Sequence, residues 1–262
     1  MSLLNTGLAG LASDIKVGVL FCTRLPIGSS AVINGPDVAR AGWAMPIAGA
    51  LVGALGSLTY WIAVALGLPP MSAAMVALIA MLIITGGLHE DGLADTADGF
   101  GGGRSREHKL AIMRDARIGT FGVCALVASL ILQWSALVSI AEPRQVATAL
   151  VAAQVSARAT LPAFMRFVPA ARADGLSAEI GRPPSWSVAT ATAIAAGALV
   201  ISLGLTGAVV ALLLLSCAGF FMGWLSVKQI GGQTGDVLGA LEQGGAIVIL
   251  LTAAALYRSW SP

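Results

Sequence analysis

The residues of this chain most able to do chemistry lie in one acidic stretch, His89-Glu90-Asp91-Gly92-Leu93-Ala94-Asp95-Thr96-Ala97-Asp98. The whole chain has only 13 Asp and Glu residues, and four of them fall here. In a helix, Asp91, Asp95 and Asp98 would stand at i, i+4 and i+7 and share an arc of roughly 60°. Carboxylates this close repel one another by about 1 kcal/mol per pair in water and by more near an apolar phase. A divalent cation relieves that repulsion, and Mg²⁺ prefers a few carboxylates plus substrate phosphates. The stretch therefore predicts a metal-dependent phosphate site.

We assign Asp91, Asp95 and Asp98 as Mg²⁺ ligands, with Glu90 as a further ligand or a base. His89 has three open interpretations: a metal ligand, a phosphate contact or a plain interface histidine. The glycines at 101–103 would let backbone amides approach a phosphate, although a mobile linker explains them equally well. The alternative for the whole stretch is a solvated helix end. Four acids beside an apolar run, with few basic neighbours, favour the cation.

A second segment carries paired arginines, Arg114 and Arg117, with Asp115 between them. Guanidinium groups bind phosphate oxygens in a fork, so the pair suits a diphosphate. Positive anchoring residues at a membrane edge, with an Asp–Arg surface pair, explain the same pattern. The sequence leaves both interpretations open.

A third segment, residues 231–242, is a glycine-rich acidic turn. It is not a phosphate loop of the Walker type, because no Gly-Lys-Ser/Thr follows. Asp236 would complete the metal shell, with Thr234 and the backbone of Gly235 near phosphate. A capped helix start with Asp236 at its N-terminus is the competing interpretation.

Arg158 is a charge inside an apolar helix. Arginines within a membrane are costly and usually face a polar cavity, which favours a substrate phosphate contact over a side chain that extends to the membrane surface.

Composition indicates which structure must position these residues. The 262 residues are 57% hydrophobic and 11% charged, and the mean hydropathy is +0.86. Soluble domains carry about 25% charged residues, so the chain is predicted to be a polytopic membrane protein. A span needs roughly 20 apolar residues. We expect an all-α transmembrane bundle forming one domain over residues 1–262, with about seven spans: 41–68, 71–88, 118–141, 145–165, two within 187–227 that turn near 204–207, and 243–257.

The basic residues are placed unevenly. With these spans, 12 of the 15 fall on one face: Lys16, Arg24, Arg40, Arg104, Arg106, Lys109, Arg114, Arg117, Arg166, Arg172, Arg182 and Lys228. By the positive-inside rule that face, with its acidic loops, is cytoplasmic. No signal peptide of the usual form is expected, and residues 1–25 are expected to form an amphipathic or partly buried helix. Cys22, Cys124 and Cys217 are far apart in apolar surroundings, which indicates burial rather than a disulfide or zinc site.

These motifs together resemble the cobalamin synthase family, the adenosylcobinamide-GDP ribazoletransferases. The most specific match is Gly86-Gly87-Leu88-His89-Glu90-Asp91-Gly92-Leu93-Ala94-Asp95-Thr96-Ala97-Asp98-Gly99. Shorter blocks at 21–26, 113–122, 171–176 and 232–240 match in the same order, so the resemblance covers essentially the whole chain.

The resemblance implies a late step of cobalamin biosynthesis at the bacterial inner membrane. The 3′-hydroxyl of α-ribazole, or of its 5′-phosphate, attacks the corrinoid-side phosphorus of adenosylcobinamide-GDP, and GMP leaves. On this basis Asp91, Asp95, Asp98 and Asp236 would bind Mg²⁺, and Arg114, Arg117 and Arg158 would hold the diphosphate. Glu90 or Asp98 would deprotonate the hydroxyl.

The expected partners are these two substrates and the lipid bilayer, with no nucleic acid. Glycine-rich spans would permit a homo-oligomer, and contact with other enzymes of the cobalamin pathway is compatible with the resemblance. Three rivals stay open: a CDP-alcohol phosphotransferase, a prenyltransferase and a divalent-cation transporter. The Ala-Arg pair of the first is absent near Asp91.

Overall fold

The computed structural model describes residues 7–27 and 34–258, and this part of the chain is built from helices without a strand. The expected all-α fold is confirmed. In chain order the elements are α1 (Leu8–Cys22), α2 (Gly35–Arg40), the 3-10 turn η1 (Ala41–Ala44), α3 (Met45–Ala65), α4 (Pro70–Thr85), α5 (Leu88–Gly102), α6 (Arg106–Ile112), α7 (Thr120–Ile140), α8 (Pro143–Phe167), α9 (Leu176–Ile180), α10 (Ser185–Ile230) and α11 (Gly235–Arg258).

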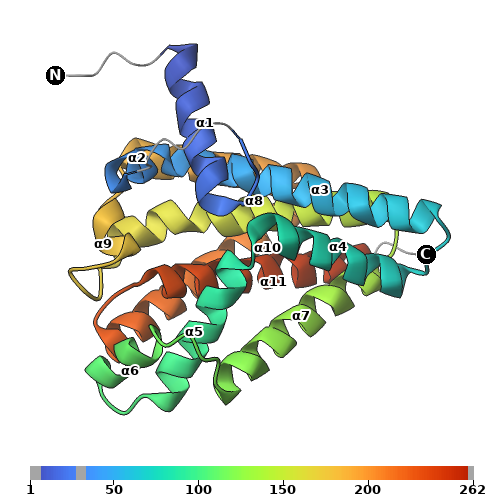
Figure 1. Ribbon diagram of the computed structural model, residues 1–262. Coiled ribbons are helices and arrows are strands. Elements are labelled where there is room, and N and C mark those ends of the chain that lie inside the picture. The colour runs from blue at the N-terminus through green and yellow to red at the C-terminus, as the bar shows by residue number, and fades with distance from the viewer. Residues whose placement is uncertain (1–6, 28–33, 259–262) are drawn as a thin grey trace.

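The long helices form one bundle around α8, which packs against α3, α10 and α11 (Figure 1). Helix α7 packs against α4, α5 and α11, and α1 packs against α3. The partly buried helix expected within residues 1–25 is therefore present over residues 8–22, with Asp14 and Cys22 buried, while residues 1–6 lie outside the described residues. Cys124 and Cys217 are exposed on the outside of the bundle, so the predicted burial is wrong for these two.

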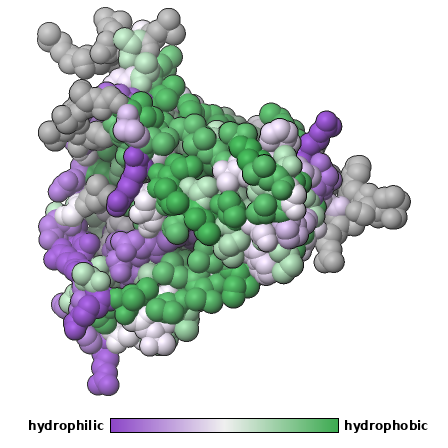
Figure 2. Space-filling view, turned by 45° about the vertical axis from the view of Figure 1, so that its right-hand side comes forward, coloured by the Kyte–Doolittle hydropathy of each residue, from purple (hydrophilic) through white to green (hydrophobic). Residues whose placement is uncertain are grey.

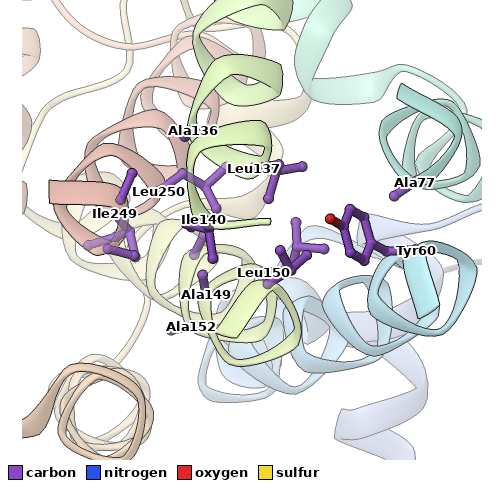
Figure 3. Packing of buried hydrophobic residues seen from close by; sticks show 14 of the residues in the cluster. Tyr60, Ala77, Ala136, Leu137, Ile140, Ala149, Leu150, Ala152, Ile249 and Leu250 are labelled. Carbon is purple, nitrogen blue, oxygen red and sulfur yellow. The ribbon is translucent and has the colours of Figure 1, made fainter. Parts of the chain in front are cut away.

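The core is made of small and branched side chains from several helices. In Figure 3, Tyr60 of α3, Leu137 of α7, Leu150 of α8 and Leu250 of α11 gather in one cluster. Alanines from α4, α7 and α8 complete it, so the helix backbones approach closely. The hydroxyl of Tyr60 donates a hydrogen bond to the carbonyl of Ala141 at 2.8 Å. This bond joins the ends of α3 and α7.

Large apolar side chains also cover the outside of the bundle. Ile201 is 85% exposed and Phe220 is 80% exposed. Figure 2 shows hydrophobic residues around the middle of the molecule and hydrophilic residues gathered mainly at one end. Soluble monomers rarely expose apolar patches of this kind, which supports the prediction of a membrane protein.

Four segments within the described residues are long and apolar enough to cross a membrane: Gly35–Ala65, Thr120–Ile140, Ser185–Ile230 and Gly235–Tyr257. The bent pair Pro70–Thr85 and Leu88–Gly102 makes a fifth if it is counted as one span. The predicted number of about seven is not confirmed and stays a prediction. Two reasons for the difference are visible. Helix α8 contains the charged Arg158, and α10 counts once although a kink divides it.

The kink of α10 lies at Gly204, where φ is 69° and ψ is 176°. A straight helix of 46 residues would be about 70 Å long at 1.5 Å per residue, roughly twice the bilayer core. Ser187 at the beginning of α10 lies against Gly42 of η1, and Gln229 near its end accepts a hydrogen bond from Lys109 of α6. The hydroxyl of Tyr257 near the end of α11 instead donates to the carbonyl of Ser202 in the middle of α10. The turn that the sequence predicts near 204–207 is therefore present.

Helices α5, α6 and α9 gather at one end of the bundle, which we call the polar end (Figure 1). Two basic residues of α6 hold it in place. Arg106 donates to the carbonyl of Ala171 at 2.6 Å, and Lys109 donates to the carbonyl of Phe100 at 3.1 Å. Lys109 also donates to Gln229 Oε1 at 2.5 Å, so the segments around 89–117, 166–186 and 228–244 lie together, as the basic-residue pattern indicated.

A sharp bend places α5 across this end. Gly86 and Gly87 both have positive φ, 67° and 71°, and α5 leaves α4 at 90°. A Cβ added at Gly86 would also lie 2.0 Å from Nε of Arg24, so the Arg24 side chain would have to move to admit it. The two glycines therefore turn the chain and admit Arg24.

Candidate active site

The acidic stretch forms helix α5, as expected if its carboxylates are to share a face. Asp91 is exposed, Asp95 is half-buried and Asp98 is buried. The exposed part of that face looks onto two cavities.

The large cavity, of about 850 Å³, is lined by carboxylates and by cationic side chains. Asp91 and Asp95 come from α5, Arg24 from the segment after α1, and Arg114 from the α6–α7 loop. Asp115 lines it as well. Two guanidinium groups and three carboxylates around one space suit a polyphosphate carried together with a cation.

The small cavity, of about 160 Å³, lies on the other side of Asp91. Its polar lining comes from α5, the α8–α9 loop, α9 and the start of α11, namely His89, Asp91, Arg172, Asp174, Ser177, Gln233, Thr234 and Asp236. Phe21, Leu88 and Asp91 line both cavities. Asp91 is therefore the carboxylate common to the two spaces.

Two loops build the small cavity by pairing with each other. The Gln233 N–H donates to the carbonyl of Pro169 at 2.8 Å, and the Ala171 N–H donates to the carbonyl of Gln233 at 2.9 Å. Gly232 allows this approach, because an added Cβ would lie 2.1 Å from the Pro169 carbonyl oxygen. The pairing sets Arg172 and Gln233 beside the same space.

Asp236 reaches the site because α5 and α11 cross closely. It stands in the first turn of α11, where Thr234 Oγ1 donates to its Oδ2 at 3.0 Å. Arg172 Nη2 lies 3.9 Å from the same oxygen. Asp95 interacts electrostatically with Asp91, Asp236 and Asp98. The structure thus brings three predicted ligands, Asp91, Asp95 and Asp236, to one region.

These carboxylates do not form a ready-made metal cage. In the described part of the chain, no three His, Cys, Asp or Glu side chains converge closely enough to hold an ion unaided. Mg²⁺ typically takes one or two protein carboxylates and completes its shell with water and substrate phosphates. The donor set therefore fits an ion that arrives with a phosphorylated substrate.

The carboxylate of Asp98 is turned toward the start of α7, whereas the sequence predicted it beside Asp91 and Asp95. Its two carboxylate oxygens accept hydrogen bonds from the Gly119 and Gly122 N–H groups, at 2.7 and 2.8 Å. An added Cβ at either glycine would lie 2.4–2.5 Å from that carboxylate. Asp98 therefore anchors the N-terminus of α7, and its role as metal ligand or base is a prediction that we do not carry into the proposal.

Glu90 points into the bundle instead of toward the two cavities. Its Oε1 accepts from Gln243 Nε2 at 3.1 Å, and Gln243 also donates to Glu242 Oε2 at 3.1 Å. The structure therefore separates Glu90 from Asp91 and Asp95, although the three are close in sequence. Its role as base stays a prediction without support from this geometry.

Arg158 belongs to the same buried network. Its Nη1 lies 2.5 Å from Glu242 Oε1 and also donates to the Gln154 side chain. Arg158 and Glu242 are 1% and 0% exposed, so the pair is sealed within the bundle. His89 Nδ1 lies 3.8 Å from Glu242 Oε2, while the residue lines the small cavity. Arg158 thus has a protein carboxylate as its partner and lines neither cavity.

The two arginines of the α6–α7 loop differ from each other. Arg114 lines the large cavity and pairs with Asp174 at 2.6 Å, and this hydrogen bond lowers the pKa of the Asp174 carboxyl. Arg117 is 89% exposed and pairs with Asp115, whose pKa its hydrogen bonds lower to about 2. Exposed pairs are weak, so Arg114 can exchange Asp174 for phosphate. Arg117 lines neither cavity.

Comparison with known proteins shows the family of this chain. The family model described as Cobalamin-5-phosphate synthase matches residues 14–254. The chain belongs to the cobalamin-5-phosphate synthase family. A relative from Bradyrhizobium diazoefficiens, named adenosylcobinamide-GDP ribazoletransferase, is 57% identical over 93% of this chain and 94% of its own. Relatives of the same name from Mesorhizobium japonicum and Ralstonia nicotianae are 45% and 35% identical, over 95% and 90% of this chain and 95% and 93% of theirs. No solved structure matches the chain.

Membership of the cobalamin-5-phosphate synthase family confirms the resemblance found in the sequence and favours it over the CDP-alcohol, prenyl and transporter alternatives. The site also contains residues that sequence reasoning had not selected, namely Arg24, Arg172, Ser177 and Gln233. Three of them lie in the blocks that carried the resemblance, at 21–26, 171–176 and 232–240. That position was the available signal, because nothing local to each residue indicates a ligand.

Proposed function

We propose that this chain is an adenosylcobinamide-GDP ribazoletransferase. It joins adenosylcobinamide-GDP to α-ribazole or α-ribazole 5′-phosphate and yields adenosylcobalamin or its 5′-phosphate and GMP. The relatives that cover nearly the whole chain carry this name. The observation that carries the proposal is that two polar cavities adjoin at Asp91. A reaction that joins two substrates needs two binding sites that lie next to each other.

The reaction is a substitution at phosphorus. The 3′-hydroxyl oxygen of the ribazole forms a bond to the corrinoid-side phosphorus, the bond from that phosphorus to the GMP oxygen breaks, and the hydroxyl proton is released. In phosphoryl transfer the protein mainly positions the reactants and stabilises charge on the phosphate oxygens.

The large cavity suits the diphosphate. Arg24 and Arg114 would bind its oxygens, with Arg114 leaving Asp174 to do so. Asp91 and Asp95, with Asp236 from the adjoining small cavity, would hold Mg²⁺ together with the substrate phosphates, whose charge the ion neutralises when bound. The three carboxylates otherwise repel one another, so the ion and the diphosphate stabilise each other at this site.

We further propose the bacterial inner membrane as the location, with the polar end in the cytoplasm. The two cavities and most basic residues share this end, which supports a cytoplasmic orientation by the positive-inside rule. Nucleotide substrates are cytoplasmic compounds, which agrees with it. Seven crossings result if α3, α4, α7, α8, both arms of α10 and α11 each span the bilayer.

The direct test uses purified protein in lipid nanodiscs with adenosylcobinamide-GDP and α-ribazole 5′-phosphate. We expect Mg²⁺-dependent GMP release that EDTA abolishes and excess Mg²⁺ restores. Full GMP release after complete chelation would refute the proposed requirement for Mg²⁺. CMP release from a CDP-lipid, or metal uptake into vesicles without nucleotide, would refute the proposed ribazoletransferase activity.

Asp95→Asn gives a sharper version of this test, because it removes one charge from the large cavity and keeps the side-chain shape. Turnover should fall at least 100-fold, on the order of an interaction made in the transition state. Asp37→Asn is the matched control at the same end of the bundle, since Asp37 of α2 pairs with Arg40 and lines neither cavity. It should keep parental activity.

A further inference from the structure

The small cavity gathers buried polar groups that have no partner in the protein. Ten buried side-chain nitrogen or oxygen atoms in the described residues lack a hydrogen bond. Three of them belong to residues that line this one cavity and have no ion-pair partner at that atom: Arg172 Nη1, Ser177 Oγ and Gln233 Oε1. Ser177 and Gln233 are 6% and 2% exposed. Native proteins rarely leave such groups unsatisfied, so their concentration indicates a polar ligand.

The size of the cavity limits that ligand. At about 160 Å³ it is far smaller than the large cavity of about 850 Å³. Sites for whole drug-sized ligands measure roughly 300–1,000 Å³. The small cavity therefore takes one part of a substrate, with the remainder outside.

The chemistry of the lining indicates which part. Arg172 offers guanidinium donors and Ser177 a hydroxyl, whereas Gln233 Oε1 is an acceptor and requires a donor from the ligand. A sugar phosphate meets both demands, since its phosphate oxygens accept and its hydroxyls donate. The long helix α11 also begins here at Gly235, and its N-terminal N–H groups favour an anion.

The position fits the acceptor substrate. Arg24 and Arg114 would bind the diphosphate of the donor in the large cavity. The attacking hydroxyl of the acceptor must reach this diphosphate at the boundary between the two cavities, where Asp91 lies. On the basis of the proposed function, we propose that the small cavity is the acceptor subsite. It holds the ribose 5′-phosphate part of α-ribazole 5′-phosphate, with Arg172 binding the phosphate and Ser177 and Gln233 binding the sugar. Arg172 then determines the preference for the phosphorylated acceptor.

The first experiment compares both acceptors in Arg172→Gln at saturating adenosylcobinamide-GDP. The KM for α-ribazole 5′-phosphate should rise about 10- to 100-fold, the size of a lost charge-assisted contact. The KM for unphosphorylated α-ribazole should change less than about threefold. Arg104→Gln is the control, because Arg104 is an exposed arginine at the same end that lines neither cavity. It should leave both constants unchanged.

Other outcomes would overturn the assignment. Equal KM increases for the two acceptors would mean that Arg172 does not recognise the phosphate. An increase confined to adenosylcobinamide-GDP would place the donor in the small cavity. In either case the proposed function would stand, since the wild type still releases GMP.

A second experiment measures binding without turnover, so that failure of the proposed function is separable. Thermal shift with ribose 5-phosphate and with α-ribazole 5′-phosphate should stabilise the wild type, and Arg172→Gln should lose both shifts. If the wild type releases no GMP but shows these shifts, the proposed sugar-phosphate subsite is supported and the proposed transferase reaction is refuted. If neither compound shifts the wild type, the subsite fails.

The variant Ser177→Ala separates a loss of substrate binding from a loss of stability. Because Ser177 Oγ has no protein partner, its removal should leave the unliganded Tm unchanged or slightly higher. It should still raise the KM for α-ribazole 5′-phosphate several-fold. An unchanged KM would remove Ser177 from the subsite.

Discussion

Gly92 of α5 lies directly against Gly239 of α11, and neither position has room for a side chain. A Cβ on Gly92 would lie 2.8 Å from the Asp236 carbonyl oxygen and 3.1 Å from Gly239 Cα, and one on Gly239 would lie 2.9 Å from the His89 carbonyl oxygen. The obstacles are backbone atoms, which cannot rotate away. This contact brings Asp236 to the acidic face of α5.

Gly92→Ala should therefore separate the two helices and reduce both activity and stability. We expect at least a tenfold loss of GMP release, and a destabilisation of about 1–3 kcal/mol from overpacking. Gly197→Ala is the control, because Gly197 is a helical glycine in α10 with nothing within 4 Å of an added Cβ. Parental activity in Gly92→Ala would show that the close contact is not needed.

Asp98→Asn tests whether this carboxylate holds α7 or a metal. Because its oxygens accept two N–H groups at the start of α7, the substitution should lower stability by about 1–3 kcal/mol. The Mg²⁺ concentration for half-maximal activity should stay the same. A large rise in that concentration with unchanged Tm would return Asp98 to the metal shell.

The buried pair of Arg158 and Glu242 predicts a non-additive effect. Arg158→Leu alone leaves Glu242 as an uncompensated buried charge and should cost about 3–5 kcal/mol. Arg158→Leu combined with Glu242→Leu should be clearly more stable than the single variant, by thermal unfolding in detergent. A phosphate role for Arg158 would instead be seen as a higher KM for adenosylcobinamide-GDP with a normal Tm.

Arg24→Gln should weaken donor binding in particular. Arg24 lines the large cavity but not the small one, so the KM for adenosylcobinamide-GDP should rise about tenfold or more while that for the acceptor stays within about threefold. Steady-state kinetics with each substrate varied in turn would measure this. A rise in the acceptor KM alone would assign Arg24 to the other substrate.

Much of this protein was predictable because the signals are local. Composition alone indicated a helical membrane protein, and the spacing of Asp91 and Asp95 placed them on one face of a helix that the structure contains. The turn in α10 followed from the length of its apolar run. The grouping of basic residues at one end required only the alternation of spans and loops.

The partners of individual side chains were decided by the tertiary structure. Asp98 shares the predicted face with Asp95, yet the start of α7 covers it. Glu90 is next to Asp91 in sequence but turns toward Gln243, which lies 153 residues away. Helical periodicity fixes the angle between residues on one helix. It does not fix which neighbouring helix each face meets, because that depends on close contacts such as the one between Gly92 and Gly239. The small cavity likewise exists only in the folded chain, because the two loops that build it are about 60 residues apart in sequence.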